Sequence, residues 1–290
     1  MPFGLKVAIA KHLFPNLGRY LPPGREVTVD DYLGEFRAVV DTTYPVEIGV
    51  LIDRYEPDTL RVIGALVREG DVCLDIGANV GAVTMAMARR VGVAGKVYAF
   101  EPGPDPYARL VRNVALNPSI RDRVVTLQMG VSSEPGTLYW NADERGNPAN
   151  ATLLSGTGTP TTVVSVDTFV AETGLDRVDF VKIDVEGMEY EVLRGGLATW
   201  RAYQPVFYLE TERRFEAIRG FPALERIERL FDEIGYRLYR MDKRGRLEAV
   251  TAATMAASTL AAPLTHRTVA AGSVLGAAVG RSAAVRARPS

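Results

Sequence analysis

The segment from Asp71 to Gly81, which reads DVCLDIGANVG, limits the possible folds more than any other part of this sequence. A short apolar run ends at Ile76 and is followed by a glycine-rich turn that opens a helical pattern. A strand over the apolar run delivers Asp75 and the turn Gly77-Ala78-Asn79-Val80-Gly81 to the carboxyl edge of a sheet, which is where open α/β sheets bind their ligands. Glycines in this turn let the backbone approach a ligand closely, because they adopt φ/ψ values that a Cβ forbids.

The spacing of the glycines indicates which ligand the turn binds. Gly77 and Gly81 form the pattern Gly-x-x-x-Gly, whereas the dinucleotide fingerprint is Gly-x-Gly-x-x-Gly. The difference favours S-adenosylmethionine, a nucleoside that carries an amino-acid tail, over a dinucleotide with its pyrophosphate. A nicotinamide-dependent oxidoreductase is the alternative enzyme class, and the glycine spacing argues against it.

Strands and helices alternate on both sides of this turn. Proline suits the first helical position, so Pro57 is expected to start a helix, and apolar periodicity marks the next ones. We expect helices at 57–68, 81–90 and 105–116, and strands at 72–76, 97–100 and 124–128. This alternation predicts an α/β fold with a doubly wound, mostly parallel sheet built from right-handed βαβ units.

The second half of the chain continues the pattern less regularly. We expect strands at 137–140, 161–169, 178–184 and 205–209, and helices at 188–193 and 224–234. The segments 236–241 and 247–250 flank the turn Asp242-Lys243-Arg244-Gly245, which is a hairpin signal. The last strand is therefore expected to run antiparallel to the others.

Composition divides the chain into three parts. Residues 1–50 are mixed and are interrupted by Pro22-Pro23-Gly24, so we expect a helical or irregular extension there. Residues 51–250 hold the strand–helix alternation and form the methyltransferase domain of this prediction, with a loop at 141–159 rich in Gly, Asn, Ser and Thr. Residues 251–290 are rich in Ala and lack acidic residues. We expect a loosely ordered tail there, with a helix on the domain or on a partner, or a weak surface anchor, as alternatives.

Bulk composition excludes several kinds of protein. The net charge is −1, which gives no overall positive field for nucleic acid. The single cysteine, Cys73, excludes an intrachain disulfide and a multi-cysteine zinc site, and the two histidines, His12 and His266, stand near opposite ends of the chain. No segment reaches the roughly 18 apolar residues of a membrane span, and no signal-peptide pattern is present. We therefore expect a cytoplasmic protein.

An acidic residue also follows the next expected strand. Glu101 comes directly after the strand at 97–100. In doubly wound folds a carboxylate at this point accepts hydrogen bonds from ribose hydroxyls. The structural alternative is a negative charge that complements the dipole of the following helix. The order of Asp75, the glycine turn and Glu101 along the chain favours the nucleoside site.

Four charged residues surround the end of another expected strand. The segment from Val178 to Gly196 reads VDFVKIDVEGMEYEVLRGG and carries Lys182, Asp184, Glu186 and Glu189. A hydroxyl that takes a methyl group from a sulfonium loses its proton to a positioned base, and a carboxylate with a raised pKa serves this purpose. We assign this role to Asp184 first and to Glu186 second. A solvated strand-to-helix loop is the alternative.

Two more pairs of residues stand near expected strand or helix ends. Glu210 and Glu212 follow a strand on the same rim. Three roles are open for these two residues: they line the acceptor pocket, they help Asp184 hold a divalent cation through oxygen ligands, or they are merely charged residues exposed to solvent at the rim. We assign no metal ligand. Tyr55 and Glu56 precede the first helix of the domain and are expected to close over the methionine end of the cofactor, with packing and solvation as the alternative.

Taken together, these motifs resemble the FkbM family of S-adenosylmethionine-dependent methyltransferases. The matching pieces are YEPDTLRVI from Tyr55, DVCLDIGANVGAVTMAMA from Asp71, GKVYAFEPGP from Gly95, FVKIDVEGMEYEVLRGG from Phe180 and PVFYLETE from Pro205. The resemblance implies a Rossmann-like class I methyltransferase fold of seven strands with the last one reversed. It implies O-methylation of hydroxyls on sugars, glycolipids, polyketides or similar metabolites. It also implies that the cofactor is bound by Asp75, Gly77, Asn79, Gly81 and Glu101.

The sequence departs from this resemblance at one point. Many similar enzymes place an acidic residue after the third strand to bind the adenine amine, whereas this chain reads Gln128-Met129-Gly130-Val131-Ser132. Backbone groups or Ser132 are expected to substitute.

Trp140 and Trp200 are interpreted as packing residues. The expected partner is a small-molecule or glycan acceptor, and a non-catalytic cofactor-binding or scaffold protein of the same fold is the alternative.

Overall fold

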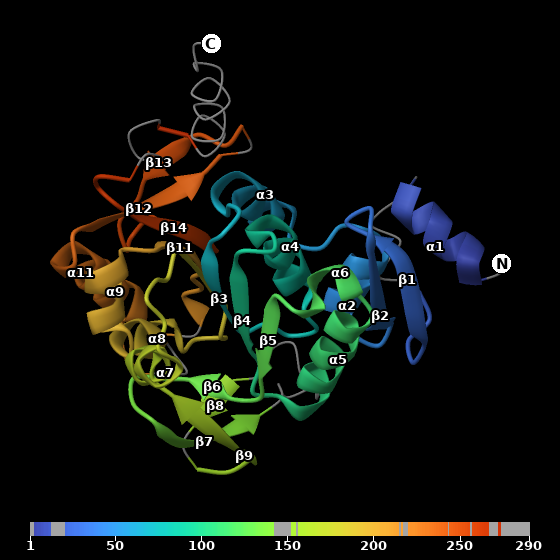
Figure 1. Ribbon diagram of the computed structural model, residues 1–290, viewed down its shortest axis with the longest axis horizontal. Helices are drawn as coiled ribbons and strands as arrows, with labels where there is room; N and C mark the ends of the chain where they lie inside the picture. Colours follow the sequence, from blue (N-terminus) through green and yellow to red (C-terminus); the bar gives the residue numbers. More distant parts are fainter. Residues whose placement is uncertain are drawn as a thin grey trace.

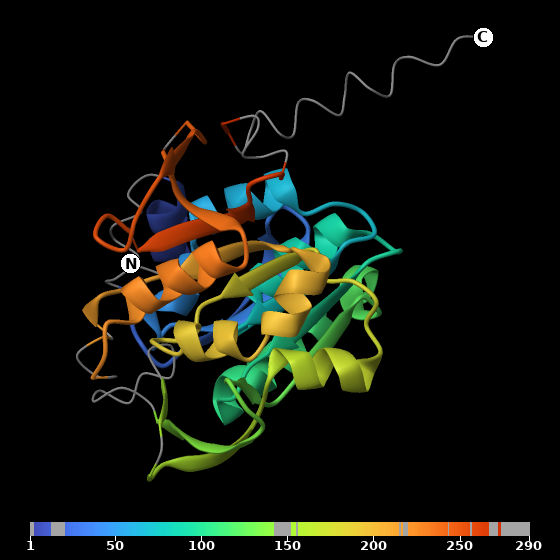
Figure 2. The same cartoon turned by 90° about the vertical axis from the view of Figure 1, so that its left-hand side faces the viewer.

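The structure is a computed structural model that describes residues 3–12, 21–141, 152–154, 156–214, 216, 220–242, 244–255, 257–266 and 272–273. Within these residues the chain forms one large sheet, a small sheet of four strands and a two-stranded hairpin (Figure 1). Helices cover both faces of the large sheet (Figure 2). This is the layered α/β arrangement predicted from the sequence.

The large sheet has the strand order β13-β12-β14-β11-β10-β3-β4-β5. The strands are Val72–Ile76 (β3), Lys96–Phe100 (β4), Val124–Leu127 (β5), Phe180–Ile183 (β10), Val206–Glu210 (β11), Tyr236–Met241 (β12), Leu247–Ala249 (β13) and Ser258–Pro263 (β14). The neighbouring strands from β5 to β11 run parallel, and β14 runs antiparallel to both of its neighbours. Ile76 is in register with both Phe100 and Ile183, so β3, β4 and β10 end at one level.

The predicted reversal of the last hairpin strand is confirmed, and the sheet holds a second reversed strand that was not predicted. The hairpin of β12 and β13 is present as predicted, but the strand between β11 and β12 is β14, which lies in the range expected to be a loose tail. In β14, Leu260, Ala261 and Ala262 are at most 1% exposed. An uncharged run of small apolar residues is also typical of a strand buried on both faces. This part of the expected tail is such a strand. The described part of the sheet has eight strands instead of the expected seven.

The segment expected to be one strand at 161–169 contains a strand and a helix. β9 covers Thr159–Val164, and α7 covers Val166–Thr173. Ser165 separates them, and its hydroxyl oxygen accepts a hydrogen bond from the backbone N–H of Thr168 at 3.1 Å. Serine at the N-cap is a strong helix-start signal. Here it outweighs the β-branched residues that suggested one continuous strand.

A small sheet lies beside the carboxyl edge of the large one. It consists of β6 (Gly130–Val131), β7 (Gly136–Asn141), β8 (Thr152–Leu154) and β9, in the order β6-β9-β7-β8. In Figure 1 it sits at the bottom, below β3, β4 and β5. The loop expected at 141–159 therefore contains β8 and the start of β9, while residues 142–151 and 155 lie outside the described part of the chain.

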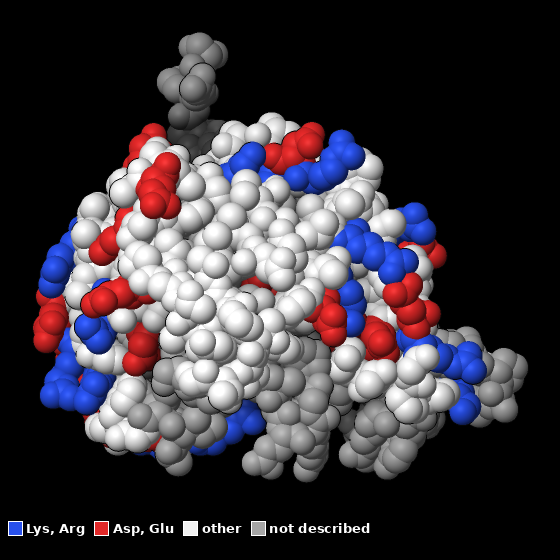
Figure 3. Space-filling view, turned by 90° about the horizontal axis from the view of Figure 1, so that it is seen from below, with Lys and Arg blue, Asp and Glu red and all other residues white. Residues whose placement is uncertain are grey.

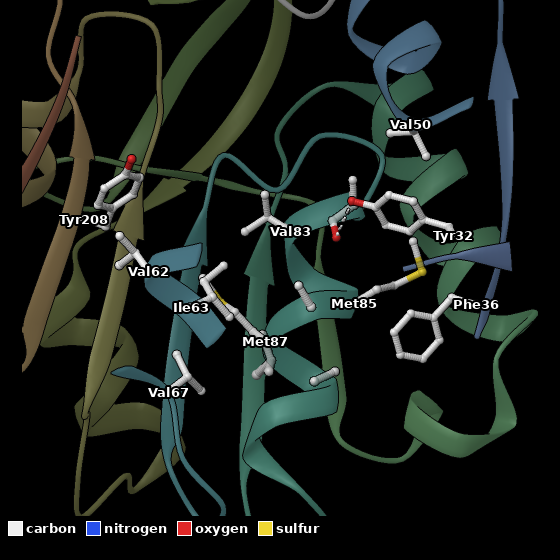
Figure 4. Close-up of a cluster of buried hydrophobic side chains, with 14 of the residues drawn as sticks. Tyr32, Phe36, Val50, Val62, Ile63, Val67, Val83, Met85, Met87 and Tyr208 are labelled. Carbon is white, nitrogen blue, oxygen red and sulfur yellow. Dashed lines mark hydrogen bonds between the residues drawn. The ribbon is translucent and has the colours of Figure 1, made fainter. Parts of the chain in front are cut away.

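The N-terminal residues share a hydrophobic core with the rest of the chain. They form α1 (Phe3–His12), β1 (Glu26–Tyr32), β2 (Phe36–Asp41) and α2 (Pro45–Leu51). Tyr32 and Phe36, each 1% exposed, pack beside Met85 on the helix α4 (Ala82–Val91) (Figure 4). The hydroxyl of Tyr32 also donates a hydrogen bond to the carbonyl oxygen of Ala82 at 3.4 Å. The expected extension thus includes a β-hairpin that the sequence-based prediction missed.

The remaining helices divide between the two faces of the large sheet. One face carries α3 (Pro57–Leu66), α4 (Ala82–Val91) and α5 (Pro104–Ala115), followed by the short α6 (Pro118–Arg121); the other carries α7, α8 (Glu189–Arg194), α9 (Leu197–Tyr203) and α11 (Ala223–Glu233). Trp200 is 0% exposed, and its ring meets that of Phe207 edge-on at 4.9 Å, which confirms it as a packing residue. Among the described helices, none is both long and apolar enough to cross a bilayer.

Candidate active site

Gly77 brings the turn after β3 into close contact with the end of β10. Its φ is 85°, and a Cβ placed on it would lie 1.8 Å from the carbonyl oxygen of Asp184. The backbone N–H groups of Gly77 and Ala78 donate hydrogen bonds to the carbonyl oxygen of Phe100 at 3.0 and 2.9 Å. Asn79 also adopts a positive φ, of 49°. The turn is thus joined to β4 and β10, and only glycine fits at its first position.

Gly81, the second glycine of the motif, has a packing role. It is the N-cap of α4 with a φ of 87°, and a Cβ on it would lie 2.7 Å from Cδ1 of Leu110 on α5. It is not among the wall residues of the hollow described next. The geometry therefore gives Gly81 the task of letting α5 approach the turn, while its predicted contact with the cofactor stays a prediction.

A hollow opens between the carboxyl ends of β3, β4 and β10 and the small sheet. It encloses about 590 Å³, open solvent at its mouth included. Five of the predicted site residues lie in its wall: Gly77, Asn79, Glu101, Asp184 and Glu186. Segments far apart in the sequence therefore meet around one space.

Glu101 is held in this wall by two backbone hydrogen bonds. Its Oε2 accepts one from the N–H of Asn79 and its Oε1 accepts one from the N–H of Gly103, both at 2.8 Å. Each carboxylate oxygen keeps a further lone pair for a ligand hydroxyl. Burial raises the pKa of Glu101 to about 7, although the two N–H donors act in the opposite direction. The predicted adjacency of the two acidic strand ends is confirmed, because Asp75 is in register with Ala99 on β4.

Asp75 does not line the hollow, and its predicted contact with the cofactor stays a prediction. Its side chain is 0% exposed, and its Oδ2 accepts a hydrogen bond from the hydroxyl of Thr84 at 2.6 Å. On the other side, Nζ of Lys182 is 3.7 Å from its Oδ1. Burial raises the pKa of Asp75, and the charge of Lys182 acts against that shift. Asp75 therefore supports the turn from behind.

Lys182 connects β10 with the glycine turn. Its Nζ donates a hydrogen bond to the carbonyl oxygen of Gly77 at 2.8 Å and lies 3.1 Å from Oδ2 of Asp184. Burial acts to lower the pKa of Lys182, but the carboxylates of Asp184 and Asp75 outweigh burial and raise it. The sequence-based prediction gave Lys182 no role. The available signal was its position two residues before Asp184, because alternate residues of a strand share a face.

Asp184 and Glu210 form a carboxyl pair with unequal proton affinities. Burial acts to raise the pKa of Asp184, but Lys182 and a hydrogen bond with Glu210 lower it below its usual value. Burial and the same hydrogen bond raise the pKa of Glu210 to about 10. At neutral pH Asp184 is therefore ionised and Glu210 is protonated. The raised pKa expected for Asp184 is wrong, because the Lys182 ammonium lies beside it.

Glu186 has the raised pKa that was expected of Asp184. Burial and then the charge of Asp184 raise the pKa of Glu186 to about 8. Its backbone adopts a positive φ of 51°, and Nη2 of Arg214 lies 3.3 Å from its Oε2. A non-glycine residue keeps such a backbone conformation only when its surroundings hold it there, which is common at functional sites.

Three of these carboxyl groups lie close enough together to hold a cation. One oxygen from each of Asp184, Glu186 and Glu210 lies within 4.8 Å of the other two, and oxygen ligands suit Mg²⁺ and Ca²⁺. Glu212 instead forms an ion pair with Arg214. Of the two rim acids considered for a cation, Glu210 joins the cluster and Glu212 does not. Since Lys182 already neutralises Asp184, we assign no metal to this cluster.

A second hollow of about 360 Å³ lies on the other side of Asp184. Glu56 contributes to its wall, together with Thr59, Tyr208 and Ser258. Glu56 has a positive φ of 38°, and its carboxylate accepts hydrogen bonds from the hydroxyls of Tyr55 and Thr59. Tyr55 itself is absent from the described walls of both hollows and packs against Gly49. Of this predicted pair, Glu56 is therefore in a position to meet a ligand and Tyr55 supports it.

Ser132 lies outside the described walls of both hollows, so its predicted part in binding the adenine stays a prediction. Its backbone N–H donates a hydrogen bond to the carbonyl oxygen of Val164 at 2.9 Å, and the residue is only 8% exposed. The preceding residues Met129, Gly130 and Val131 line the hollow instead. The wall near the end of β5 is therefore apolar, and Ser132 belongs to the contact between the two strands β6 and β9.

Trp140 and Leu153 of the small sheet complete the wall, and the sequence-based prediction assigned neither to the site. Trp140 was interpreted as a packing residue, and no role was given to Leu153. The pairing of Trp140 with Leu153 across β7 and β8 is what places them together. A strand pairing across an irregular loop has no sequence signal comparable to a glycine turn, so this part of the wall had to come from the structure.

The strand order and the turn define the class of protein. A mostly parallel sheet with two antiparallel strands, β14 and β13, on one side, a glycine turn after β3 and an acidic residue after β4 make up a Rossmann-like class I methyltransferase fold. The chain belongs to the FkbM family of methyltransferases, because the Methyltransferase FkbM domain matches residues 75–238.

Several known proteins are similar to this chain. The hexuronic acid methyltransferase AglP of Haloferax volcanii is 32% identical over 143 residues, which are 49% of this chain and 56% of AglP. The methyltransferase sdnD of Sordaria araneosa is 34% identical over 155 residues, 42% of this chain and 59% of sdnD. The 31-O-demethyl-FK506 methyltransferase FkbM of Streptomyces tacrolimicus is 31% identical over 166 residues, 46% of this chain and 62% of that protein.

A crystal structure of a methyltransferase FkbM from Methylobacillus flagellatus KT is 12% identical to this chain. The match covers 75% of this chain and 54% of that one, with a TM-score of 0.43. The chain spans between 56% and 62% of the length of the three relatives described above.

Proposed function

We propose that this protein transfers a methyl group from S-adenosylmethionine to a hydroxyl group of a sugar, glycolipid or polyketide-type metabolite. The observation that carries the proposal is that Glu101, the turn at Gly77 and the acidic residues Asp184 and Glu186 face one hollow. The relatives support the acceptor class, since one is a hexuronic acid methyltransferase and another a 31-O-demethyl-FK506 methyltransferase.

The donors and acceptors in the wall fit this cofactor. Glu101 accepts hydrogen bonds from the ribose hydroxyls in our proposal, because its oxygens keep lone pairs beyond their two backbone bonds. The ionised carboxylate of Asp184 faces both hollows and suits a positively charged sulfur. Glu56 in the second hollow suits the ammonium group at the methionine end. In this proposal the first hollow takes the ribose and the second takes the methionine end of the cofactor.

The reaction asks for positioning and for one proton acceptor. S-adenosylmethionine supplies, when bound, a methyl group on a positively charged sulfur. Glu186 takes the hydroxyl proton while the acceptor oxygen bonds to the methyl carbon and the carbon–sulfur bond breaks. With donor and acceptor bound, the walls of the hollow would have to hold the oxygen, carbon and sulfur in line, and such positioning would supply much of the rate enhancement in a displacement of this kind.

Glu186 suits the role of base better than Asp184 does, which reverses the predicted order. A general base works best when its pKa lies near the working pH. The pKa of Glu186 is raised to about 8, first by burial. That of Asp184 is lowered by Lys182 although burial acts the other way. Asp184 therefore stays ionised and stabilises positive charge, while Glu186 accepts the proton.

Two measurements test the proposal. Calorimetric titration with S-adenosylhomocysteine tests the cofactor site, and we expect a single saturable binding event. Incubation of cell extracts with a methyl-labelled donor, followed by mass spectrometry, tests transfer, and we expect label on a hydroxyl of at least one metabolite. Label that persists with Glu186→Gln would contradict the assigned base. Absent binding, or binding of NADH instead, would overturn the cofactor assignment, and binding without transfer would favour a non-catalytic protein.

A further inference from the structure

The small sheet that covers the hollow is uncharged. Its strands β6, β7, β8 and β9 contain no Asp, Glu, Lys or Arg. From the side of this sheet, the surface shows a broad central area without charged side chains and charged groups around its margin (Figure 3). Trp140 and Leu153 carry this uncharged character into the wall of the hollow.

Both residues lie directly against backbone that has no side chain in the way. A Cβ on Gly103 would lie 2.9 Å from Nε1 and Cε2 of Trp140. A Cβ on Gly130 would lie 2.3 Å from Cδ1 of Leu153. Since the N–H of Gly103 donates to Oε1 of Glu101, the indole packs on the same loop that holds the proposed ribose carboxylate. The two glycines thus make room for an apolar wall beside the expected position of the ribose.

The hollow has a charged end and an apolar end. Its charged wall residues, Glu101, Asp184 and Glu186, follow β4 and β10. The wall residues from the end of β5 and from the small sheet are Met129, Gly130, Val131, Trp140 and Leu153. None of these five has a carboxylate or amide side chain that could pair with the edge of a purine. The apolar end lies where the chain after β5 has no acidic residue.

We propose that Trp140 and Leu153 hold the nucleobase of the cofactor by stacking and shape, and that no side chain of the described wall pairs with its exocyclic amino group. The inference rests on the proposed function, because it concerns the same cofactor. Stacking on an aromatic ring depends little on the substituents of a base, since every base has a π-face. The protein is therefore expected to tolerate a cofactor whose adenine is replaced by hypoxanthine.

The test compares two dead-end ligands by calorimetry on the wild-type protein. S-Adenosylhomocysteine and S-inosylhomocysteine differ at the amino group and at the adjacent ring nitrogen, which exchanges an acceptor for a donor. We expect their Kd values to agree within about threefold, because no paired side chain is lost. A Kd for the inosyl ligand that is about tenfold higher or more would indicate hydrogen-bond recognition of the base and would overturn the proposal. If neither ligand binds, the proposed function itself fails.

Variants of the small sheet locate the contact. Trp140→Ala is expected to weaken both ligands equally, by roughly tenfold, the lower range for loss of one base–aromatic stack, and Trp140→Phe should retain most of the affinity. Tyr139→Ala is the matched control, because neighbouring strand residues point to opposite faces. Unchanged affinity in Trp140→Ala, with an unchanged melting temperature, would overturn the assignment.

Fluorescence gives a second readout that does not depend on affinity. The chain has two tryptophans, and Trp200 is 0% exposed in the core. Saturating S-adenosylhomocysteine is expected to change the emission of the wild-type protein but not that of Trp140→Phe. An equal change in both would place the ligand away from Trp140 and contradict the proposal.

Discussion

Lys182 forms a buried ion pair with Asp184, with 3.1 Å between Nζ and Oδ2. The same Nζ donates a hydrogen bond to the carbonyl oxygen of Gly77 at 2.8 Å. One side chain therefore joins the end of β10 to the glycine turn and also keeps Asp184 ionised. Breaking a buried network of this kind is costly, because the groups that remain are left unpaired.

Replacing Lys182 with Met is expected to destabilise the protein by about 3–5 kcal/mol, because Asp75 and Asp184 lose their buried cation. Urea denaturation at pH 7 measures this change. Lys96→Met is the matched control, since Lys96 donates only to the exposed carbonyl oxygen of Asp122 at 2.9 Å, and its loss should stay below about 1 kcal/mol. Equal destabilisation in the two variants would show that the network contributes nothing.

The pH dependence of methyl transfer is expected to report Glu186. With a pKa raised to about 8 by burial and by Asp184, Glu186 is mostly protonated below that pH and cannot accept a proton. The kcat/KM should therefore rise by about tenfold per pH unit and level off near pH 8. Glu186→Gln should lower kcat by about 10²–10⁴-fold and abolish the slope. Glu212→Gln is the control, because it changes the other acidic partner of Arg214, and it should keep both the kcat and the pH dependence of kcat/KM. A pH dependence that survives in Glu186→Gln would identify a different base.

Stability is expected to fall as the pH rises from about 6 to 8.5. Burial is the main cause that raises the pKa of Glu47, Glu101 and Glu189 to about 7 and that of Glu186 to about 8, from an ordinary value of 4.5. Between those values the folded state binds more protons than the unfolded chain, so raising the pH favours unfolding. Burial lowers the pKa of His266, which acts in the opposite direction but is a single group.

Thermal unfolding at constant ionic strength measures this effect, and we expect the Tm to drop by at least about 4 °C across the interval. Glu101→Gln removes one of the contributing groups, so its Tm should vary less with pH than that of the wild-type protein. A Tm that rises with pH, or an identical slope in the variant, would show that these buried acids are ionised in the folded state at lower pH than stated.

A methyl group at Gly77 is expected to disrupt the turn, whereas one at Gly70 is not. Both glycines have nearly the same φ, 85° and 84°, so alanine is strained to a similar extent at each. Only at Gly77 does the added Cβ collide, at 1.8 Å from the carbonyl oxygen of Asp184, while Gly70 has open space around it. Gly70→Ala should cost about 1 kcal/mol in urea denaturation and keep S-adenosylhomocysteine binding. Gly77→Ala should destabilise the protein by more than Gly70→Ala does and should abolish S-adenosylhomocysteine binding. Equal stability and equal binding in the two variants would rule out the collision.

The part of the site that the sequence predicted is the part built from local motifs. Gly77, Asn79 and Glu101 sit at strand ends that apolar runs and turns mark clearly, and the register of β3 with β4 follows from βαβ topology. The burial of the Asp75 side chain was not predictable in the same way. Asp75 and Glu101 each follow or end an apolar strand, and only the position of Lys182 in the folded chain shows which of them faces inward.

The parts that the sequence did not predict depend on partners distant in the chain. The lowered pKa of Asp184 comes from Lys182 and Glu210, and the wall residue Trp140 depends on the pairing of β7 with β8 and β9. Ser165 carried a local signal for a helix start that β-branched neighbours obscured. Wherever a long-range contact decides a residue's environment, composition and periodicity leave more than one outcome open.

A chain that ends at residue 250 is expected not to fold, although composition suggested that only a loose tail follows. β14 lies between β11 and β12, where Phe207 is in register with Ala261 and Leu238 with the same residue on the other side. Its removal would leave two strands without their shared neighbour and would take Leu260 and Ala262, which are at most 1% exposed, out of the core. A chain that ends at Ser273 keeps every strand of the described sheet and is the matched control. Circular dichroism and thermal unfolding of the two truncated chains measure the difference; if the chain ending at 250 unfolds as cooperatively and at the same temperature as the control, β14 is dispensable and the sheet order stated here is wrong.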